Sequence, residues 1–95
     1  MVIALKGVVR MNLNEEINKL FPALELILGK EELADFKNTD KNELYLYHFG
    51  LGLWIRNNLL TEKGALYQAF TENNITLKDD MSSLIIKTFY GCLID

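Results

Sequence analysis

The sequence predicts an all-α fold, a small single-domain orthogonal bundle of about five helices. Apolar residues recur at three- and four-residue steps along most of the chain, and no strand-like alternation follows residue 10. No repeat or Pro/Gly/Ser-rich linker divides the 95 residues, and 49% of them are hydrophobic, enough for one compact core. We therefore expect residues 11–95 to form one helical domain. Residues 1–10 are expected to be either a short extended arm or a start-site extension.

The first helical segment begins at a capping-box pattern in residues 12–15. An apolar stripe follows, made of Ile17, Leu20, Phe21, Leu24, Ile27 and Leu28. Pro22 interrupts this stripe. Either the helix kinks there, or one helix ends at Phe21 and a second begins with Pro22 in its opening turn. Gly29 predicts a stop, after which residues 30–37 form a short acidic helix.

A central helix is predicted over residues 41–59, with N-cap candidates in residues 38–40. Its apolar residues point in all directions, which is typical of a helix in the middle of a domain. One side carries Leu44, Tyr47, Leu51, Trp54 and Ile55, and another carries Leu46, Phe49 and Leu53. Gly50 and Gly52 each cost such a helix about 1 kcal/mol relative to Ala. They are therefore expected to allow the close approach of a neighbouring backbone.

Two further helices complete the predicted bundle. Thr61 is expected to cap the first of them, and the pair Asn73-Asn74 to end it. Its buried edge is predicted to contain Ala65, Leu66, Ala69 and Phe70. A second capping box in residues 76–79 opens the last helix, although Asp replaces the preferred Glu. The last apolar stripe contains Met81, Leu84, Ile85, Phe89 and Cys92, so the single cysteine is expected to be a small buried hydrophobe.

Polar residues among the buried positions predict a structural clamp between two helices. His48, Gly52 and Arg56 fall at four-residue steps and should share one face of the central helix. We expect Asp79 or Asp80 to accept hydrogen bonds from Arg56, as a buried pair that fixes geometry more than it adds stability. The residues of this predicted clamp are His48, Arg56, Asn57, Asp79, Asp80 and Ser82. The alternative is that the same face forms a ligand-binding or catalytic pocket.

No pattern in the chain predicts an enzyme. Ser82 and Ser83 lack a nucleophile elbow, and the sole histidine would have to serve any triad. One histidine, one cysteine and one carboxylate pair do not make a zinc site, and no dinucleotide or phosphate-loop fingerprint is present. We therefore predict no catalytic residues, no metal and no cofactor.

The distribution of charge favours a protein partner. The net charge of -3 argues against nucleic-acid binding, and no apolar run approaches the roughly 20 residues of a membrane span. Acidic residues gather in the first half of the chain, and the candidate partner-binding residues are Glu25, Glu31, Glu32 and Asp35. Such a patch steers basic proteins, for example a toxin or nuclease. The alternative is that these acidic residues form an ordinary solvated surface.

Two sequence blocks resemble a known family. They are His48-Phe-Gly50-Leu-Gly52-Leu-Trp54-Ile-Arg56-Asn57-Asn58 and Asp79-Asp80-Met-Ser82. The chain resembles, over roughly residues 38–93, a family of small uncharacterised bacterial domains with an HFGLGxWIRNN block followed by a D-D/E-M-S block. The resemblance implies a compact helical domain and no particular reaction. The chain departs from the pattern after Asn58, where Leu59-Leu60-Thr61 replaces the expected Trp and Gly, and it lacks a Pro before the acidic pair.

These observations lead to a hypothesis of a non-enzymatic, cytoplasmic protein-binding module, such as an immunity or inhibitor protein with an acidic helical surface. A lone thiol agrees with a reducing compartment. The alternative is a small-ligand-binding or enzymatic domain that uses the face of His48, Arg56 and Asp80. Self-association is a third possibility, because so small a core is not expected to hold all of the aromatic side chains of Trp54, Tyr45, Tyr47 and Tyr90.

Overall fold

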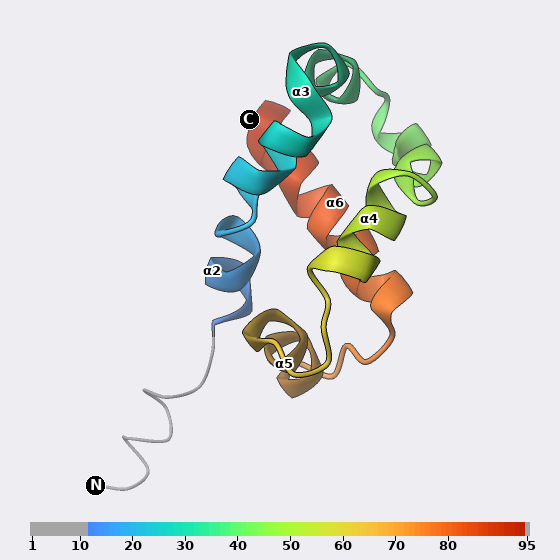
Figure 1. Cartoon of the computed structure of the whole chain (residues 1–95). Coiled ribbons are helices and arrows are strands. Elements are labelled where there is room, and N and C mark those ends of the chain that lie inside the picture. Colours follow the sequence, from blue (N-terminus) through green and yellow to red (C-terminus); the bar gives the residue numbers. More distant parts are fainter. Residues whose placement is uncertain (1–11, 95) are drawn as a thin grey trace, which may run out of the picture.

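A computed structural model describes residues 12–94, which contain five α-helices, one 3-10 helix and no strand (Figure 1). The elements are α2 (Leu13–Asn18), α3 (Phe21–Lys37), the 3-10 helix η1 (Lys41–Tyr47), α4 (Leu51–Asn58), α5 (Ala65–Glu72) and α6 (Lys78–Ile94). The predicted all-α bundle is therefore confirmed. The arm predicted for residues 1–10 lies outside the described residues.

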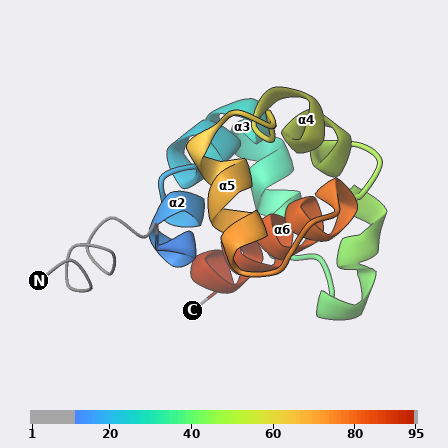
Figure 2. The ribbon, with the colours of Figure 1, turned by 90° about the horizontal axis from the view of Figure 1, so that it is seen from below.

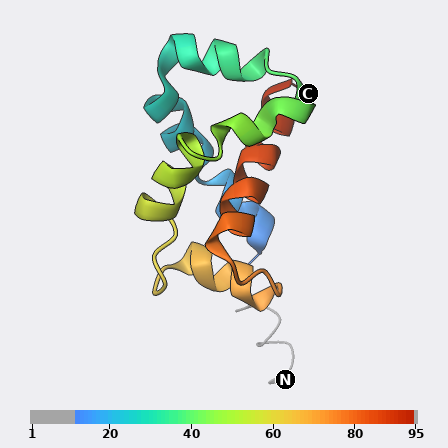
Figure 3. The same ribbon diagram turned by 90° about the vertical axis from the view of Figure 1, so that its right-hand side faces the viewer.

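Helix α6 is the element around which the others are arranged. It packs against α4, α3, η1 and α2, while α2 also packs against α5. Figure 3 shows α6 running along the length of the molecule, with α5 lying across its N-terminal end. Figure 2 shows α2 and α5 side by side. The helices cross one another, so each helix that packs against α6 contacts it over only part of its length.

Aromatic rings join α3 to α6 at the centre of the core. Phe36 and Phe89 are both buried, and their rings stack with centroids 5.4 Å apart. The ring centroids of Phe21 and Phe89 lie 5.2 Å apart. The rings of Phe36 and Tyr47 meet edge to face, with their centroids 4.8 Å apart. Such pairs each add roughly 0.5–1.5 kcal/mol beyond the burial of their area.

A small polar network fixes η1 between α3 and α6. The Thr39 hydroxyl donates to the Asp35 carbonyl at 2.8 Å and lies 3.2 Å from the Tyr47 hydroxyl. The Tyr90 hydroxyl donates to the Thr39 carbonyl at 2.6 Å. This network was not expected from the sequence, since the bonded residues Thr39 and Tyr90 are 51 positions apart.

The structure of the first half of the chain decides between the two alternatives given for Pro22. Asn12 caps α2 by accepting from the Glu15 amide at 3.2 Å, as predicted. Helix α3 begins at Phe21 with Pro22 in its first turn, so the chain forms two helices and not one kinked helix. The predicted stop at Gly29 is confirmed, because its non-helical φ of 76° and ψ of 172° divide α3 into two helical stretches at a kink. The predicted acidic helix, residues 30–37, is the stretch of α3 after this kink.

The predicted central helix is wrong, because the chain breaks into two elements there. Asp40 caps η1 by accepting from the Asn42 amide at 3.0 Å, and η1 ends at Tyr47. A turn follows at residues 48–50, and α4 then starts at Leu51. The break turns one predicted apolar side outward, so the prediction that Leu46, Phe49 and Leu53 are buried is also wrong. Helix α4 nevertheless buries Leu51 and Ile55, as expected.

The last two helices follow the prediction with local corrections. Helix α5 begins at Ala65 after Gly64, so Thr61 does not cap it, and Ala65 is exposed. Asn74 has a φ of 66°, as predicted for a helix end. The second predicted capping box is misplaced as well, because α6 begins at Lys78 and residue 76 lies before its cap position.

Cys92 is exposed, contrary to the prediction of a buried thiol. Buried positions on α6 repeat at four-residue steps, with Ile85 followed by Phe89. The next step reaches Leu93, which packs partly against the core. Cys92 lies one position earlier and therefore faces outward.

Candidate functional site

The predicted clamp between the two helices, α4 and α6, is present, but the residue at its centre is Ser82. Arg56, in the last turn of α4, donates from Nη1 to the Ser82 Oγ at 3.0 Å and from Nη2 to the His48 carbonyl at 3.3 Å. Its Nε lies 3.5 Å from the Asp79 Oδ1. Ser82 is fully buried in the first turn of α6, and its hydroxyl donates to the Asp79 carbonyl at 3.0 Å. All three guanidinium nitrogens are therefore engaged within the protein.

Gly52 makes the room that this arrangement needs. A Cβ at residue 52 would lie 3.1 Å from the Arg56 Nη1, 3.4 Å from the Tyr47 carbonyl oxygen and 3.6 Å from the Ile86 Cδ1. The prediction of a close approach is confirmed at Gly52, where α6 and the backbone of η1 both come near. A Cβ at Gly50 would meet nothing within 4 Å, so Gly50 has no such role.

Four residues of the predicted clamp lie differently from expectation. The expected burial of the ion pair is wrong for the acid, because the Asp79 side chain is 71% exposed and that of Arg56 is 13% exposed. Asp80 and Asn57 are exposed, and neither makes a side-chain hydrogen bond or ion pair with any residue in the described range 12–94. His48 precedes α4 and contributes only its backbone carbonyl. The four-residue spacing placed it correctly beside Arg56, but for the wrong reason.

A second feature is an apolar groove between α3 and the η1–α4 turn, which we call the α3–α4 groove. Its volume is about 330 Å³. It is lined by Ile27, Leu28, Glu32, Leu46, Tyr47, Gly50, Leu51 and Trp54. Large apolar side chains stand exposed in the same elements, with Phe49 exposed by 80% and Leu46 by 57%. The sequence analysis missed this surface because it assumed an unbroken central helix.

The acidic residues predicted to bind a partner are all exposed on α3. Glu32 lines the α3–α4 groove. Asp35 lies one helical turn after Glu31 and Glu32, so these three can share a face beyond the Gly29 kink. Glu25 lies before the kink and is not part of the groove lining. The groove is therefore apolar at its base and acidic at one edge.

A family model described as a domain of unknown function, DUF6794, matches residues 15–93. The chain belongs to the DUF6794 family. The match includes every described helix except the first two residues of α2 and the last of α6, and both sequence blocks lie inside it. Comparison with curated proteins and with solved structures gave no significant match. The function of this DUF6794 domain is therefore argued from its geometry.

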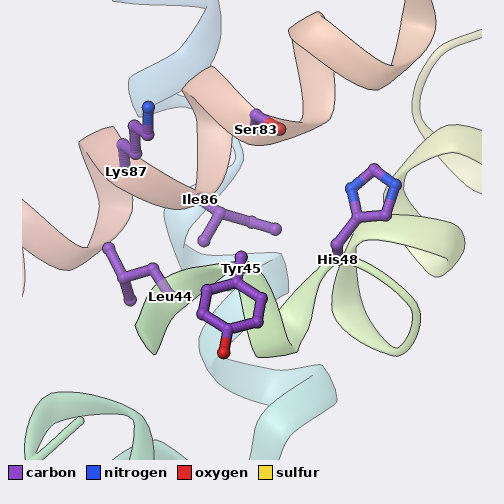
Figure 4. Close-up of a pocket in the computed structure, with 6 residues that line it drawn as sticks. All are labelled: Leu44, Tyr45, His48, Ser83, Ile86 and Lys87. Carbon is purple, nitrogen blue, oxygen red and sulfur yellow. The ribbon is translucent and has the colours of Figure 1, made fainter. Parts of the chain in front are cut away.

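The third feature of the DUF6794 domain is a groove between η1 and α6, which we call the η1–α6 groove. Its smaller part has a volume of about 210 Å³ and is lined by Leu44, Tyr45, His48, Ser83, Ile86 and Lys87 (Figure 4). In Figure 4, Leu44 and His48 lie opposite α6, on η1 and the following turn, and the Tyr45 ring with its hydroxyl points away from α6. A larger part of about 580 Å³ lies next to Lys87 and continues towards Ile94.

No group of three or more His, Cys, Asp or Glu residues that could hold a metal ion occurs within residues 12–94. In that same range, every buried side-chain nitrogen or oxygen has a hydrogen-bond partner. None of the helices in the described part has the length and apolarity needed to cross a membrane. The clamp links α4 to α6 inside the protein, and the two grooves are hollows on its surface.

Proposed function

We propose that this DUF6794 domain is a non-enzymatic protein-binding module whose α3–α4 groove receives a segment of a partner protein. The observation that carries the proposal is an apolar groove with the exposed Leu46 in its lining and the exposed Phe49 and Leu53 in the adjoining turn and helix. Exposed apolar groups that gather beside a hollow are typical of interaction sites, whereas single ones are ordinary. A basic toxin or nuclease inhibited by this domain is the partner class that fits best.

The edge of the groove indicates the chemistry of the partner. Glu32 is the charged residue among those that line it, and Glu31 and Asp35 lie nearby on α3. An amphipathic helix with an apolar face and flanking lysine or arginine residues would satisfy both features, in the helix-in-groove mode of recognition. Complementary charge would mainly raise the association rate, while the apolar contacts would supply most of the affinity.

The geometry gives less support to the alternative of a small-ligand or enzymatic site at His48, Arg56 and Asp80. The Arg56 guanidinium already has Ser82, the His48 carbonyl and Asp79 as partners. Asp80 is exposed and takes no part in this network. A ligand at this face would first have to displace the internal hydrogen bonds of Arg56.

The proposal is tested with variants that differ only in where an apolar surface is lost. Leu46→Ser/Phe49→Ser removes the exposed anchors, and Leu77→Ser is the matched control, because Leu77 is exposed by 63% outside the groove. A partner captured by the wild-type domain is identified, purified and titrated by calorimetry against each variant. We expect a basic partner that binds the groove variant at least about tenfold more weakly, because losing one anchor costs about 1–2 kcal/mol.

A second pair of variants tests the role of charge. Glu32→Lys/Asp35→Lys should lower the association rate severalfold at low salt, whereas Glu62→Lys, in the loop before α5, should change it little. An acidic partner, or equal binding by the groove variant and the Leu77→Ser control, would overturn the proposal. So would light scattering at two concentrations that shows the groove to be covered by a second copy of this chain.

A further inference from the structure

The η1–α6 groove is independent of the α3–α4 groove and extends along α6. Its two parts are adjacent hollows that share Leu44 and Lys87 as lining residues. The lining on α6 reaches from Ser83 to Ile94. The eleven helical steps between these two residues span about 16 Å. The larger part alone, at about 580 Å³, falls within the roughly 300–1,000 Å³ typical of small-molecule sites.

The charge of this groove is opposite to that of the whole chain. Lys41 on η1 and Lys87 on α6 both line it, and no aspartate or glutamate within residues 12–94 does, although the chain has a net charge of -3. Within residues 12–94, neither lysine makes an ion pair. Asn42, His48 and Ser83 add further hydrogen-bonding groups. Two lysines that share one hollow and have no carboxylate partner favour an anion from outside the protein.

The remaining lining of the groove is apolar. Leu44, Ile86 and Tyr90 belong to the buried core and form its base. The Tyr90 hydroxyl is already committed to the Thr39 carbonyl, so Tyr90 presents a ring surface to the groove. Gly91 leaves the larger part open, because a Cβ there would meet nothing within 4 Å. A ligand that fits must therefore carry an apolar body as well as a negative charge.

We propose that the η1–α6 groove binds a small amphiphilic anion, with a carboxylate or phosphate group between Lys41 and Lys87 and an apolar body against Leu44 and Ile86. In Figure 4 the Lys87 ammonium points away from Leu44 and Tyr45, and its flexible four-carbon stem lets it turn to a bound head group. The proposal does not depend on the α3–α4 groove, since the two linings have no residue in common.

The first experiment uses simple ligands that separate charge from hydrophobic contact. Decanoate, decyl phosphate and decanol are titrated, below any micelle concentration, into the isotopically labelled protein and followed by backbone amide chemical shifts. We expect saturable shifts at Leu44, Lys87 and Gly91 with one or both anions, and binding at least about tenfold weaker with decanol. The stronger of the two anions assigns the head group. Equal binding of decanol, or no saturable shift with either anion, would overturn the proposal.

Variants then locate the site. Lys41→Gln/Lys87→Gln should weaken binding of the anion at least about tenfold, whereas Lys30→Gln/Lys63→Gln, two exposed lysines outside the lining, should leave it unchanged. Gly91→Leu should block the larger part without disturbing the fold, and Gly91→Ala serves as its smaller control. Equal affinity in both lysine double variants would overturn the proposal. An unchanged unfolding temperature in each variant shows that lost binding is not lost structure.

Discussion

Among single residues, Arg56 determines how α4 and α6 are joined. Its guanidinium is mostly buried and reaches a hydroxyl, a backbone carbonyl and a carboxylate in three directions. The carboxylate of Asp79 is largely exposed, so water screens this contact and exposed pairs contribute only about 0–1 kcal/mol. The hydrogen bond to the fully buried Ser82 is therefore the stronger part of the link.

The first prediction compares the two ends of this link. Arg56→Ala should lower the free energy of unfolding by about 2–3 kcal/mol, because a buried hydroxyl loses its donor and the packed arginine stem is lost. Asp79→Ala should cost less than about 1 kcal/mol. Urea unfolding of both variants beside the wild type measures the difference. Equal losses would show that the exposed carboxylate, and not Ser82, is the main partner of Arg56.

Sequence spacing predicted that Arg56 would contact the start of the last helix, but not which residue there would accept its hydrogen bond. Neighbouring residues on a helix point about 100° apart, so Asp79 and Asp80 cannot both face α4. The choice depends on how α6 is rotated, which is set by its buried side chains. Ser82 is buried three residues after Asp79, and that rotation places both beside Arg56.

Between elements, the breaks in the helices were the least predictable feature. The apolar period continues through residues 48–50, so it gave no sign that η1 and α4 are separate. Two glycines within three residues, Gly50 and Gly52, were the available signal, because each weakens a helix. Because this break was not predicted, the exposed apolar surface around Phe49 was not predicted either.

The kink in α3 leads to a prediction at the same scale. Gly29 has a φ of 76° and a ψ of 172°, a region that is essentially restricted to glycine. Gly29→Ala should therefore destabilise the domain by about 1–3 kcal/mol, although a Cβ there would meet no other atom within 4 Å. Thermal unfolding of Gly29→Ala beside Gly91→Ala, a helical glycine with equal space, isolates the backbone effect. A stabilised Gly29→Ala variant would mean that α3 is straight in solution.

Across the whole molecule, the sequence predicted the core better than the surface. Residues with a helical period on α6, such as Met81, Ile85 and Phe89, are buried as expected, because α6 packs against four other elements and has few ways to turn. Residues near the chain breaks had no such constraint. The exposure of the apolar groups in and beside the α3–α4 groove could therefore not be predicted from the sequence and was found only in the structure.

The central position of α6 gives the last prediction, which uses two phenylalanines as a matched pair. Phe89 is 1% exposed and packs against both Phe21 and Phe36, so Phe89→Ala should cost about 3–5 kcal/mol. Phe49 is 80% exposed, and Phe49→Ala should stay within about 0.5 kcal/mol of the wild type. Small domains have a total stability of only about 5–15 kcal/mol, so the first variant should unfold at far lower urea concentration. A comparable loss in Phe49→Ala would show that Phe49 is buried in solution, and the exposed apolar surface next to the α3–α4 groove would then not include it.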